Sequence, residues 1–435
     1  MKLSFKASIA AGLLSLSVAS IPLPALAQKA TVRMWTFLNP AGTTPREVTL
    51  AKIVSDFQAA NPDIEIVTET HAFDQLTPKF LAAHGAGKAP DIIWAATDFL
   101  GDAIGSGSLA DLNDLFIKKW TPEQIADRKG PYWDLTNRDG KQYALFTSRN
   151  YISILYRPDF FKEAGLDPAT IKTWDDFVKA AKALTVTDAS GQIVRYGFAQ
   201  GYSEHQADPL LMIPMVLANG ESIFKKDGRA NFASPAGIAA MKFQTDLIKE
   251  HKVSPPQAAT WTVDDVYEQF ASGRAAMILG ASVRVSTLQS KLGDDKVGMM
   301  LWPGSGDVKH APAVMAGWAV GVWSGSKVKA QAGKFVEYML GPDGDKLWVT
   351  SGGQSPGLQS TLNGLGDFTK QPGKAYLNVA AEGSANYGWL APIDFSAGGY
   401  RQALNKAGQR ILVNGEDVKT SLERAEAEFN RQHKR

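Results

Sequence analysis

The sequence predicts an α/β fold built from two domains. The chain has 435 residues, which is more than one hydrophobic core usually serves, so two domains are expected. Segments with the period of a strand alternate with segments that have the period of a helix, which indicates a mainly parallel sheet covered on both faces. Hydrophobic residues make up 44% and charged residues 21%, as in ordinary globular proteins.

The first part of the chain shows this alternation most clearly. Residues 31–37, 64–67 and 89–94 have the patterns of strands. Leu50, Ile53, Val54 and Phe57 recur at helical spacing, and Asn61-Pro62 is expected to end that helix. A further helix is expected over residues 74–84.

The middle and the end of the chain are richer in predicted helix. Thr173 followed by Asp176 is typical of a capped helix start, with Phe177, Ala180, Ala181 and Leu184 on one face. Ser234-Pro235 predicts another start, a cap followed by proline at the first helical position. Residues 402–432 predict a pair of helices broken at Asn414-Gly415.

The first 27 residues have the pattern of a secretory signal peptide. Lys2 and Lys6 precede an apolar run over residues 7–21, and Ala25-Leu-Ala27 is a small-x-small cleavage signature. That run is short for a membrane span, and no other stretch approaches 18 apolar residues. We expect cleavage after Ala27 and a periplasmic product that is not embedded in the membrane.

Charge and cysteine content exclude several classes of protein. Two of the 46 basic residues lie in the signal segment, and the remaining 44 balance the 44 acidic residues. This balance gives no support for nucleic-acid binding. The chain has no cysteine, which excludes disulfides, thiolate catalysis, thiolate metal sites and a lipid anchor on cysteine.

Short motifs along nearly the whole chain after the signal segment resemble one family. They include Asn61-Pro-Asp-Ile-Glu-Ile66, Ala89-Pro-Asp-Ile-Ile-Trp94, Thr173-Trp-Asp-Asp-Phe177, Phe270-Ala-Ser-Gly-Arg-Ala-Ala-Met277 and Ala316-Gly-Trp-Ala-Val-Gly321. In this order and spacing the chain resembles the extracellular solute-binding proteins of family 1, the sugar-type receptors of ABC importers.

The resemblance implies a two-lobe periplasmic binding protein fold of type II, with a ligand cleft between the lobes. Residues 28–147 and 276–318 are expected in the N-terminal lobe, and residues 148–275 and 319–435 in the C-terminal lobe. Crossings between the lobes are expected near residues 146–151, 274–281 and 317–324. The partners implied are a sugar or polyol ligand and the permease subunits of the importer, and the protein itself is expected to be a monomer.

Sugars present hydroxyl edges and apolar faces, so a receptor needs aromatic platforms and fixed hydrogen-bonding groups. Several aromatic residues follow strands or lie in irregular segments, where a ligand can reach them. These candidates are Trp35, Trp261, Trp318, Tyr387 and Trp389. Trp94, Trp174 and Trp348 lie within strand or helix patterns and are expected in the core.

The family pattern implies further ligand contacts. Phe73 is expected as a wall with Asp74 beside it, and Asp98 as an acceptor for two neighbouring hydroxyls. The first crossing offers Arg149 or Asn150, and Gly317 matches directly beside Trp318. Ser282 or Arg284 replaces a tryptophan of many relatives, and Gln354 occupies a polar or aromatic contact position. These candidates are Phe73, Asp98, Asn150, Ser282, Arg284, Gly317, Trp318 and Gln354.

Asp394 bears on the charge of the ligand. The glycerol-phosphate branch of the family is expected to place a basic residue near this position, where an acid would repel a phosphate dianion. Arg401 lies close in sequence and is an alternative partner for a phosphate. The pattern favours an unphosphorylated sugar or polyol.

Catalytic motifs are weak. Gly353-Gln-Ser-Pro-Gly357 fits the G-x-S-x-G pattern, but the residue after the serine must donate its backbone N–H to an oxyanion, and Pro356 has none. The six histidines never recur at i+3 or i+4, so a local zinc motif is absent from the sequence. No Gly-Lys-Ser/Thr phosphate loop occurs either, and no cofactor is expected.

We therefore expect a non-catalytic receptor that delivers a carbohydrate or polyol to a permease. A receptor of the same fold for glycerol phosphate or an amine is one alternative. A secreted glycoside hydrolase is the alternative from another class, because its two carboxylates need no proximity in sequence.

Overall fold

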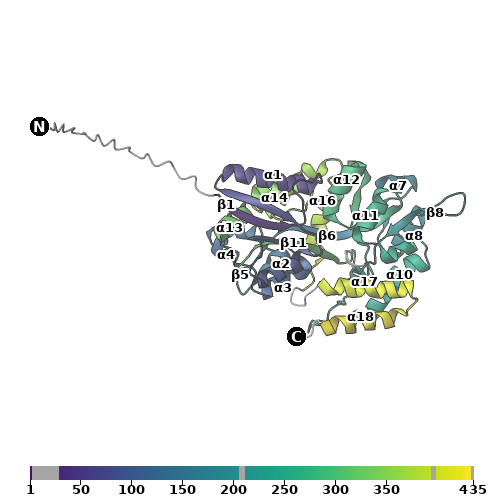
Figure 1. Cartoon of the computed structure of the whole chain (residues 1–435). Helices are drawn as coiled ribbons and strands as arrows, with labels where there is room; N and C mark the ends of the chain where they lie inside the picture. Colours follow the sequence, from purple (N-terminus) through teal and green to yellow (C-terminus); the bar gives the residue numbers. More distant parts are fainter. Residues whose placement is uncertain (2–28, 205–210, 393–397, 433–435) are drawn as a thin grey trace.

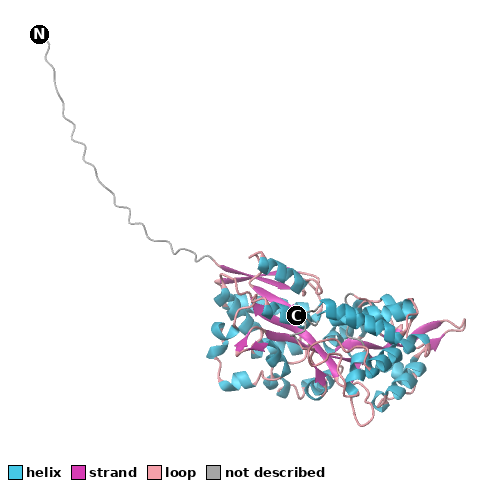
Figure 2. Ribbon diagram, turned by 90° about the horizontal axis from the view of Figure 1, so that it is seen from below, coloured by secondary structure: helices cyan, strands magenta, loops and turns pink. Residues whose placement is uncertain are grey.

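The computed structural model describes Met1 and residues 29–204, 211–392 and 398–432. The predicted signal segment and Asp394 lie outside these residues. Two lobes stand side by side, joined by a sheet that runs from one to the other (Figure 1). In the described residues, ten strands form this sheet, in the order β2-β1-β3-β11-β6-β9-β8-β7 with β10 and β12 attached at its side. Helices cover the strands of both lobes (Figure 2).

The first lobe contains the elements that precede strand β6 and three helices that follow strand β11. Its elements are β1 (Ala30–Thr36), α1 (Pro45–Ala60), β2 (Ile64–Thr70), α2 (Leu76–Gly85), β3 (Ile92–Ala96), α3 (Leu100–Gly105), α4 (Leu112–Leu115), α5 (Pro122–Ala126), α6 (Pro131–Thr136), β4 (Asn137–Arg138), β5 (Lys141–Gln142), α13 (Lys329–Met339), α14 (Pro342–Thr350) and α15 (Gln359–Asn363).

The second lobe holds the remaining helices and the other end of the sheet. Its elements are α7 (Pro158–Glu163), α8 (Trp174–Leu184), β7 (Val186–Thr187), β8 (Ile193–Ala199), α9 (Met212–Ala218), α10 (Pro235–Lys249), α11 (Val263–Ala271), β9 (Ala275–Ala281), α12 (Val285–Leu292), β10 (Gly298–Met300), α16 (Tyr376–Asn386), β12 (Gly388–Trp389), α17 (Gly398–Val413) and α18 (Val418–Gln432).

Two long strands, β6 (Leu145–Tyr156) and β11 (Ala313–Val322), connect the lobes. The first half of β6 pairs with β11 beside β3, and its second half pairs with β9, with Ile152 opposite Ala281. A third connection follows α15, and Gly373 on it accepts a hydrogen bond from Gln289 of α12. The expected crossings on β6 and β11 are thus observed, whereas residues 274–281 form a strand inside the second lobe.

These pairings differ from the expected division into lobes. Strand β9, expected in the first lobe, pairs with β8 and β6 of the second. Helices α13 and α14, expected in the second lobe, pack against α1 of the first lobe. We propose residues 29–150 and 317–363 as the first lobe and the other described residues as the second.

The expectation of a mainly parallel sheet is wrong at the centre. Strands β1, β2 and β3 are parallel, as are β8 and β9. The connecting strands β6 and β11 run antiparallel to each other and to their other main partners, β3 and β9. This mixed arrangement follows from the crossings. Strand β6 takes the chain from the first lobe to the second and β11 takes it back, so the two strands run in opposite directions.

The predicted helix signals act as expected. The Thr173 side chain accepts from the Asp176 N–H at 3.1 Å, and the Asp176 carboxylate accepts from the Thr173 N–H at 3.1 Å. The predicted face of α8 (Phe177, Ala180, Ala181 and Leu184) is buried. Ser234 likewise caps α10 through a bond from the Gly237 N–H. The terminal pair α17 and α18 separates at the predicted break, where Gly415 has a φ of 68°.

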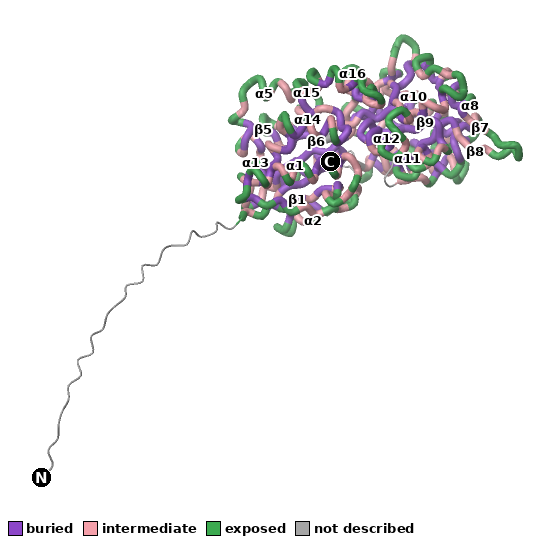
Figure 3. Tube along the Cα trace, turned by 90° about the horizontal axis from the view of Figure 1, so that it is seen from above, coloured by how far each residue is buried: buried purple, intermediate pink, exposed green. Residues whose placement is uncertain are grey.

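Each lobe has a buried interior along its strands (Figure 3). Trp94 and Trp348 are fully buried and their rings meet edge to face at 5.9 Å in the first lobe. Trp174 is 8% exposed and packs on Trp302 in the second. All three core tryptophan predictions are confirmed. None of the helices in the described residues is long and apolar enough to cross a membrane.

Candidate ligand-binding site

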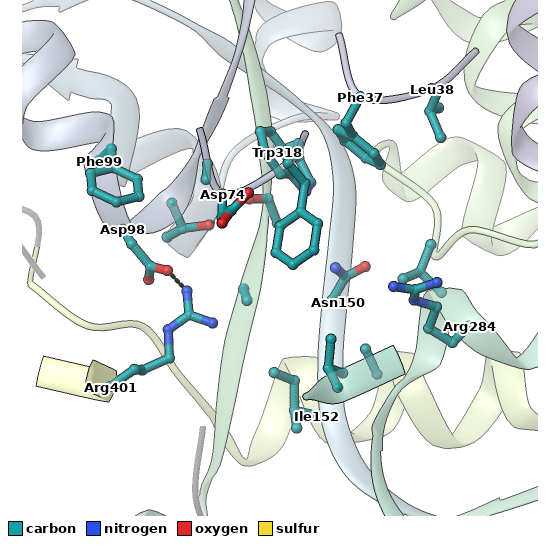
Figure 4. A pocket seen from close by; sticks show the side chains of 18 of the residues that line it. Phe37, Leu38, Asp74, Asp98, Phe99, Asn150, Ile152, Arg284, Trp318 and Arg401 are labelled. Carbon is teal, nitrogen blue, oxygen red and sulfur yellow. Dashed lines mark hydrogen bonds and ion pairs between the residues drawn. The ribbon is translucent and has the colours of Figure 1, made fainter. Parts of the chain in front are cut away.

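A cavity of about 470 Å³ lies where the two lobes face each other (Figure 4). This volume is within the roughly 300–1,000 Å³ of sites for small organic ligands. Both lobes and both connecting strands contribute to its walls. A molecule bound there would contact both lobes and both connecting strands.

The first lobe contributes the segments that follow three parallel strands. Phe37 comes after β1, Phe73 and Asp74 after β2, and Asp98 after β3. The carboxyl ends of parallel strands meet at one edge of a sheet, and ligands of α/β proteins commonly bind there. The alternation of strand and helix therefore places these four side chains together.

Aromatic rings form one wall. The rings of Phe37 and Trp318 lie 4.4 Å apart, and Phe37 also meets the buried Trp94 edge to face at 5.8 Å. Trp318 is 9% exposed, and Thr97 donates to the carbonyl of the preceding Gly317 at 2.8 Å. The indole is thus held rigidly, with its exposed part against the cavity, as a platform for an apolar sugar face requires.

An ion pair spans the cavity. Asp98, after β3 of the first lobe, pairs with Arg401 of α17 in the second lobe (Figure 4). Burial lowers the pKa of Arg401 to about 10, so its guanidinium remains charged at neutral pH. The predicted hydroxyl acceptor therefore already has a cationic partner, which also fixes its orientation.

Other polar groups face the cavity as well. One carboxylate oxygen of Asp74 is buried and has no hydrogen-bond partner among the described residues. Asn150 extends into the cavity from β6 (Figure 4). Asn405 of α17 donates to the Ser203 carbonyl at 2.8 Å, while its amide oxygen has no partner within the described chain. Asp74 and Asn405 thus each leave one oxygen that a ligand hydroxyl could donate to.

Two further arginines lie at another part of the wall. Arg46, in the first turn of α1, is 8% exposed, and its Nε has no hydrogen-bond partner among the described residues. Arg284, after β9 of the second lobe, bonds Asp264 at 3.0 Å and lies over the ring of Tyr267. Burial and the neighbouring charge of Arg284 lower the pKa of Arg46 to about 9.

Six of the predicted site residues line this cavity: Phe73, Asp98, Asn150, Arg284, Gly317 and Trp318. They come from both lobes and from both connecting strands. Their contact with a ligand remains a prediction. Asp394 lies outside the described residues.

Two predicted aromatic platforms are directed elsewhere. Trp35 still belongs to β1, and its indole donates to Glu69 at 2.7 Å and packs on His71. Only Phe37, after the end of that strand, reaches the cavity. Trp261 lines a separate depression on the second lobe, beside Tyr196 and Arg274.

Four other predicted residues do not line the cavity either. Ser282 is fully buried and accepts from the Tyr151 N–H at 3.2 Å. Gln354 is 1% exposed and is not among the residues that line the cavity. Tyr387 packs its ring on His310, and Trp389 lies in β12, paired with Val314 of β11. In each case backbone pairing or packing orients the side chain, which sequence position alone does not show.

Sequence reasoning overlooked several lining residues. Phe37, Arg46, Tyr267 and Asn405 all face the cavity. Phe37 follows the end of a parallel strand, as Asp98 does. The rule that ligands bind at the carboxyl ends of parallel strands would therefore have predicted it. Arg46 places a positive charge in a helix first turn, where the macrodipole disfavours cations. That contradiction of a local rule was a usable signal.

The structure gives no geometric support for catalytic chemistry at the G-x-S-x-G segment. Ser355 is 8% exposed and follows helix α14 instead of a strand. Its hydroxyl lies 3.5 Å from that of Ser282, and a second hydroxyl cannot act as the base that activates a nucleophilic serine. Within the described residues, histidine and acidic side chains nowhere gather in threes as a metal site would need.

Two α/β lobes joined by crossing strands, with a cavity between them, define the class of two-lobe periplasmic binding proteins. The family model of the bacterial extracellular solute-binding proteins matches residues 41–346. The chain therefore belongs to this family, as the sequence resemblance predicted.

Curated relatives are similar over part of their length. A probable amino-acid ABC transporter periplasmic-binding protein of Sinorhizobium fredii is 26% identical over 54% of this chain and 56% of its own. An arabinooligosaccharide-binding protein of Halalkalibacterium halodurans is 28% identical over 44% of this chain and 40% of its own. The aligned segments thus span about half of these relatives.

Solved structures share the fold over almost the entire chain. An ABC transporter solute-binding protein of Thermotoga lettingae, bound to α-D-tagatose, superposes with a TM-score of 0.80. It is 24% identical, and the match covers 93% of this chain and 99% of that one. The predicted two-lobe fold is therefore confirmed.

Proposed function

We propose that this protein is the substrate-binding component of an ABC importer, which captures a carbohydrate or polyol and delivers it to the membrane permease. The cavity between the lobes carries the proposal. Phe37 and Trp318 offer an aromatic wall for a sugar face, while Asp74 and Asp98 offer carboxylates for its hydroxyls. The names of the arabinooligosaccharide-binding relative and of the tagatose complex support the same ligand class.

The proposed mechanism is closure of the two lobes on the ligand. Asp98 and Trp318 line the cavity from the first lobe, and Arg284 lines it from the second. In this mechanism a small ligand contacts all three side chains at once only when the lobes are close together. A ligand that fits the closed form better shifts the population toward it. The permease would then distinguish the closed, loaded protein from the open one.

We place this activity in the periplasm, after removal of the signal segment over residues 1–27, with no chemical change in the ligand. The family of extracellular solute-binding proteins supports an exported location. Sequencing the N-terminus of the exported protein tests the cleavage site, since a mature protein that begins before Gln28 would contradict it.

A thermal-unfolding screen tests the ligand class. Sugars, polyols, glycerol phosphate, amino acids and polyamines are added separately, and a ligand that binds only the folded state raises the unfolding midpoint. We expect a rise with carbohydrates or polyols and unchanged ligand on chromatography afterwards. A rise with amines alone would favour an amine receptor that uses Asp74, and hydrolysis products would favour a glycosidase.

A further inference from the structure

Arg46 is a buried cation for which the described part of the chain shows no hydrogen bond to the guanidinium Nε. Its side chain lines the interlobe cavity, the residue is 8% exposed, and its Nε has no hydrogen-bond partner among the described residues. Its guanidinium lies 5.5 Å from the centre of the Phe37 ring. The face of the Phe37 ring attracts the positive charge of the guanidinium, but it does not serve as a hydrogen-bond acceptor for the planar N–H donors of that group. A buried charge left in this state is costly unless something pairs with it.

The acidic groups near Arg46 are already engaged. Glu47 accepts from the backbone and hydroxyl of Thr44 and from the Asn39 N–H, which completes the cap of α1. Asp264 bonds Arg284 and has a side chain that is 60% exposed. Asp98 pairs with Arg401, and both lie across the view of Figure 4 from Arg284. Among the described residues, none of these carboxylates forms an ion pair or hydrogen bond with Arg46.

Arg284 brings a second cation to the same region from the other lobe. Helix α12, which begins directly after Arg284, packs against α1, which carries Arg46. The bond to Asp264 uses one donor of Arg284 and leaves others for a ligand. The two guanidinium groups repel each other, since the charge of Arg284 contributes to the lowered pKa of Arg46. This repulsion opposes closure of an empty cavity.

Helix α1 adds to the positive field. It has 16 residues, and Arg46 lies in its first turn, where the aligned peptide dipoles favour an anion and disfavour a cation. An oxyanion bound here would therefore be stabilised by the fork of Arg46, by Arg284 and by the helix end. It would also link the two lobes.

We propose that Arg46 and Arg284 form an oxyanion subsite of the interlobe cavity, and that the natural ligand is an acidic sugar carrying a carboxylate or a phosphate. This inference rests on the proposed function, because it assumes that a sugar occupies the cavity. Asp74 and the aromatic wall hold the neutral part of the ligand, and the two arginines bind its charged group from opposite lobes. This proposal differs from the expectation of an uncharged ligand drawn from the sequence.

Calorimetric titration of the full mature protein with matched sugars tests the subsite. The probes are D-galactose, D-galacturonate and D-galactose 6-phosphate, together with the α-1,4-linked di- and trisaccharides of galactose and galacturonate. We expect at least one acidic sugar to bind about tenfold or more tightly than its neutral partner, as charge-assisted bidentate bonds allow. The uronate and phosphate arms distinguish the two sources of the oxyanion.

Substitution of Arg46 locates the preference. In Arg46→Met the affinity for the acidic sugar should fall more than that for the neutral sugar, so that the advantage of the acidic sugar drops below about threefold. Arg46→Lys keeps the positive charge but loses the planar guanidinium that can form two parallel hydrogen bonds. It should therefore retain part of the preference for the acidic sugar. Arg33→Met is the control, since Arg33 lies in the same lobe and pairs with Glu69 outside the cavity. Unfolding midpoints without ligand verify that each variant folds.

The outcomes separate the two proposals. Equal affinity for acidic and neutral sugars, or a preference unchanged in a folded Arg46→Met, would overturn the oxyanion subsite and leave the sugar receptor standing. Absence of binding by every sugar would overturn both. If Arg46→Met does not fold, the affinities of the wild-type protein for acidic and neutral sugars provide the test. High salt should then weaken the preference of the wild type for the acidic sugar.

Discussion

The ring of Phe37 lies 4.4 Å from that of Trp318, with 37° between the planes. Phe37 follows the first strand of the chain, and Trp318 lies on the second strand that connects the lobes. Their contact joins one wall of the cavity to a strand that runs between the lobes. Under the proposed mechanism, a ligand that stacks on this wall would be coupled to closure.

Replacing Trp318 by alanine should weaken carbohydrate binding by more than about 1 kcal/mol, because the aromatic platform is lost. Titration calorimetry or quenching of the remaining tryptophan fluorescence measures the change. Trp261→Ala is the matched control, since Trp261 lines a different depression, and its affinity should stay that of the wild type. Equal losses in both variants would assign Trp318 a packing role only.

The pair of Asp98 and Arg401 predicts coupling between the lobes. Asp98→Asn should lower the free energy of unfolding by about 1–3 kcal/mol, because it leaves a largely buried guanidinium without its partner. It should also increase the radius of gyration of the unliganded protein in solution scattering.

A double-mutant cycle with Arg401→Met isolates this pair. The second substitution should cost little once Asp98 is replaced, since the interaction has already gone. A coupling energy below about 0.5 kcal/mol would show that the two residues act independently.

The lowered pKa of Arg46 predicts pH dependence for an acidic ligand. Burial and Arg284 bring this pKa to about 9, against weaker attraction from Glu47, Tyr267 and Asp264. Below that pH the guanidinium is protonated before binding. Above it, the complex must take up a proton, so affinity for galacturonate should fall as the pH rises through about 9.

Galactose provides the comparison, since its binding does not require a charged Arg46 and should change less over the same range. Arg46→Met should lose the difference between the two pH profiles. Identical profiles for galacturonate and galactose in the wild type would contradict the prediction.

The cap of α8 predicts a local effect on stability. Thr173→Ala removes the acceptor of the Asp176 N–H and should cost about 1 kcal/mol, a typical value for a lost helix cap. Chemical denaturation measures it. Lys182→Ala, at an exposed position of the same helix, is the control and should change stability by less than about 0.5 kcal/mol.

Local patterns identified the elements correctly because short-range physics forms them. The cap at Thr173, the proline after Ser234 and the break at Gly415 all act over a few residues. Phe73 and Asp98, which line the cavity after parallel strands, came from the family resemblance and not from a local pattern. The family resemblance supplied Asn150, Gly317 and Trp318, whose positions depend on long-range pairing.

The sequence by itself determined the α/β class, the helix boundaries and the core tryptophans, since periodicity and capping depend on neighbours along the chain. Only the tertiary structure decided which lobe holds β9, α13 and α14, and which aromatic residues face the cavity. Trp35 and Phe37 are two residues apart, yet only Phe37 reaches it. Arg46 and Arg284 likewise line one cavity from segments of different lobes. Such contacts depend on how distant elements pack, and no local pattern records that.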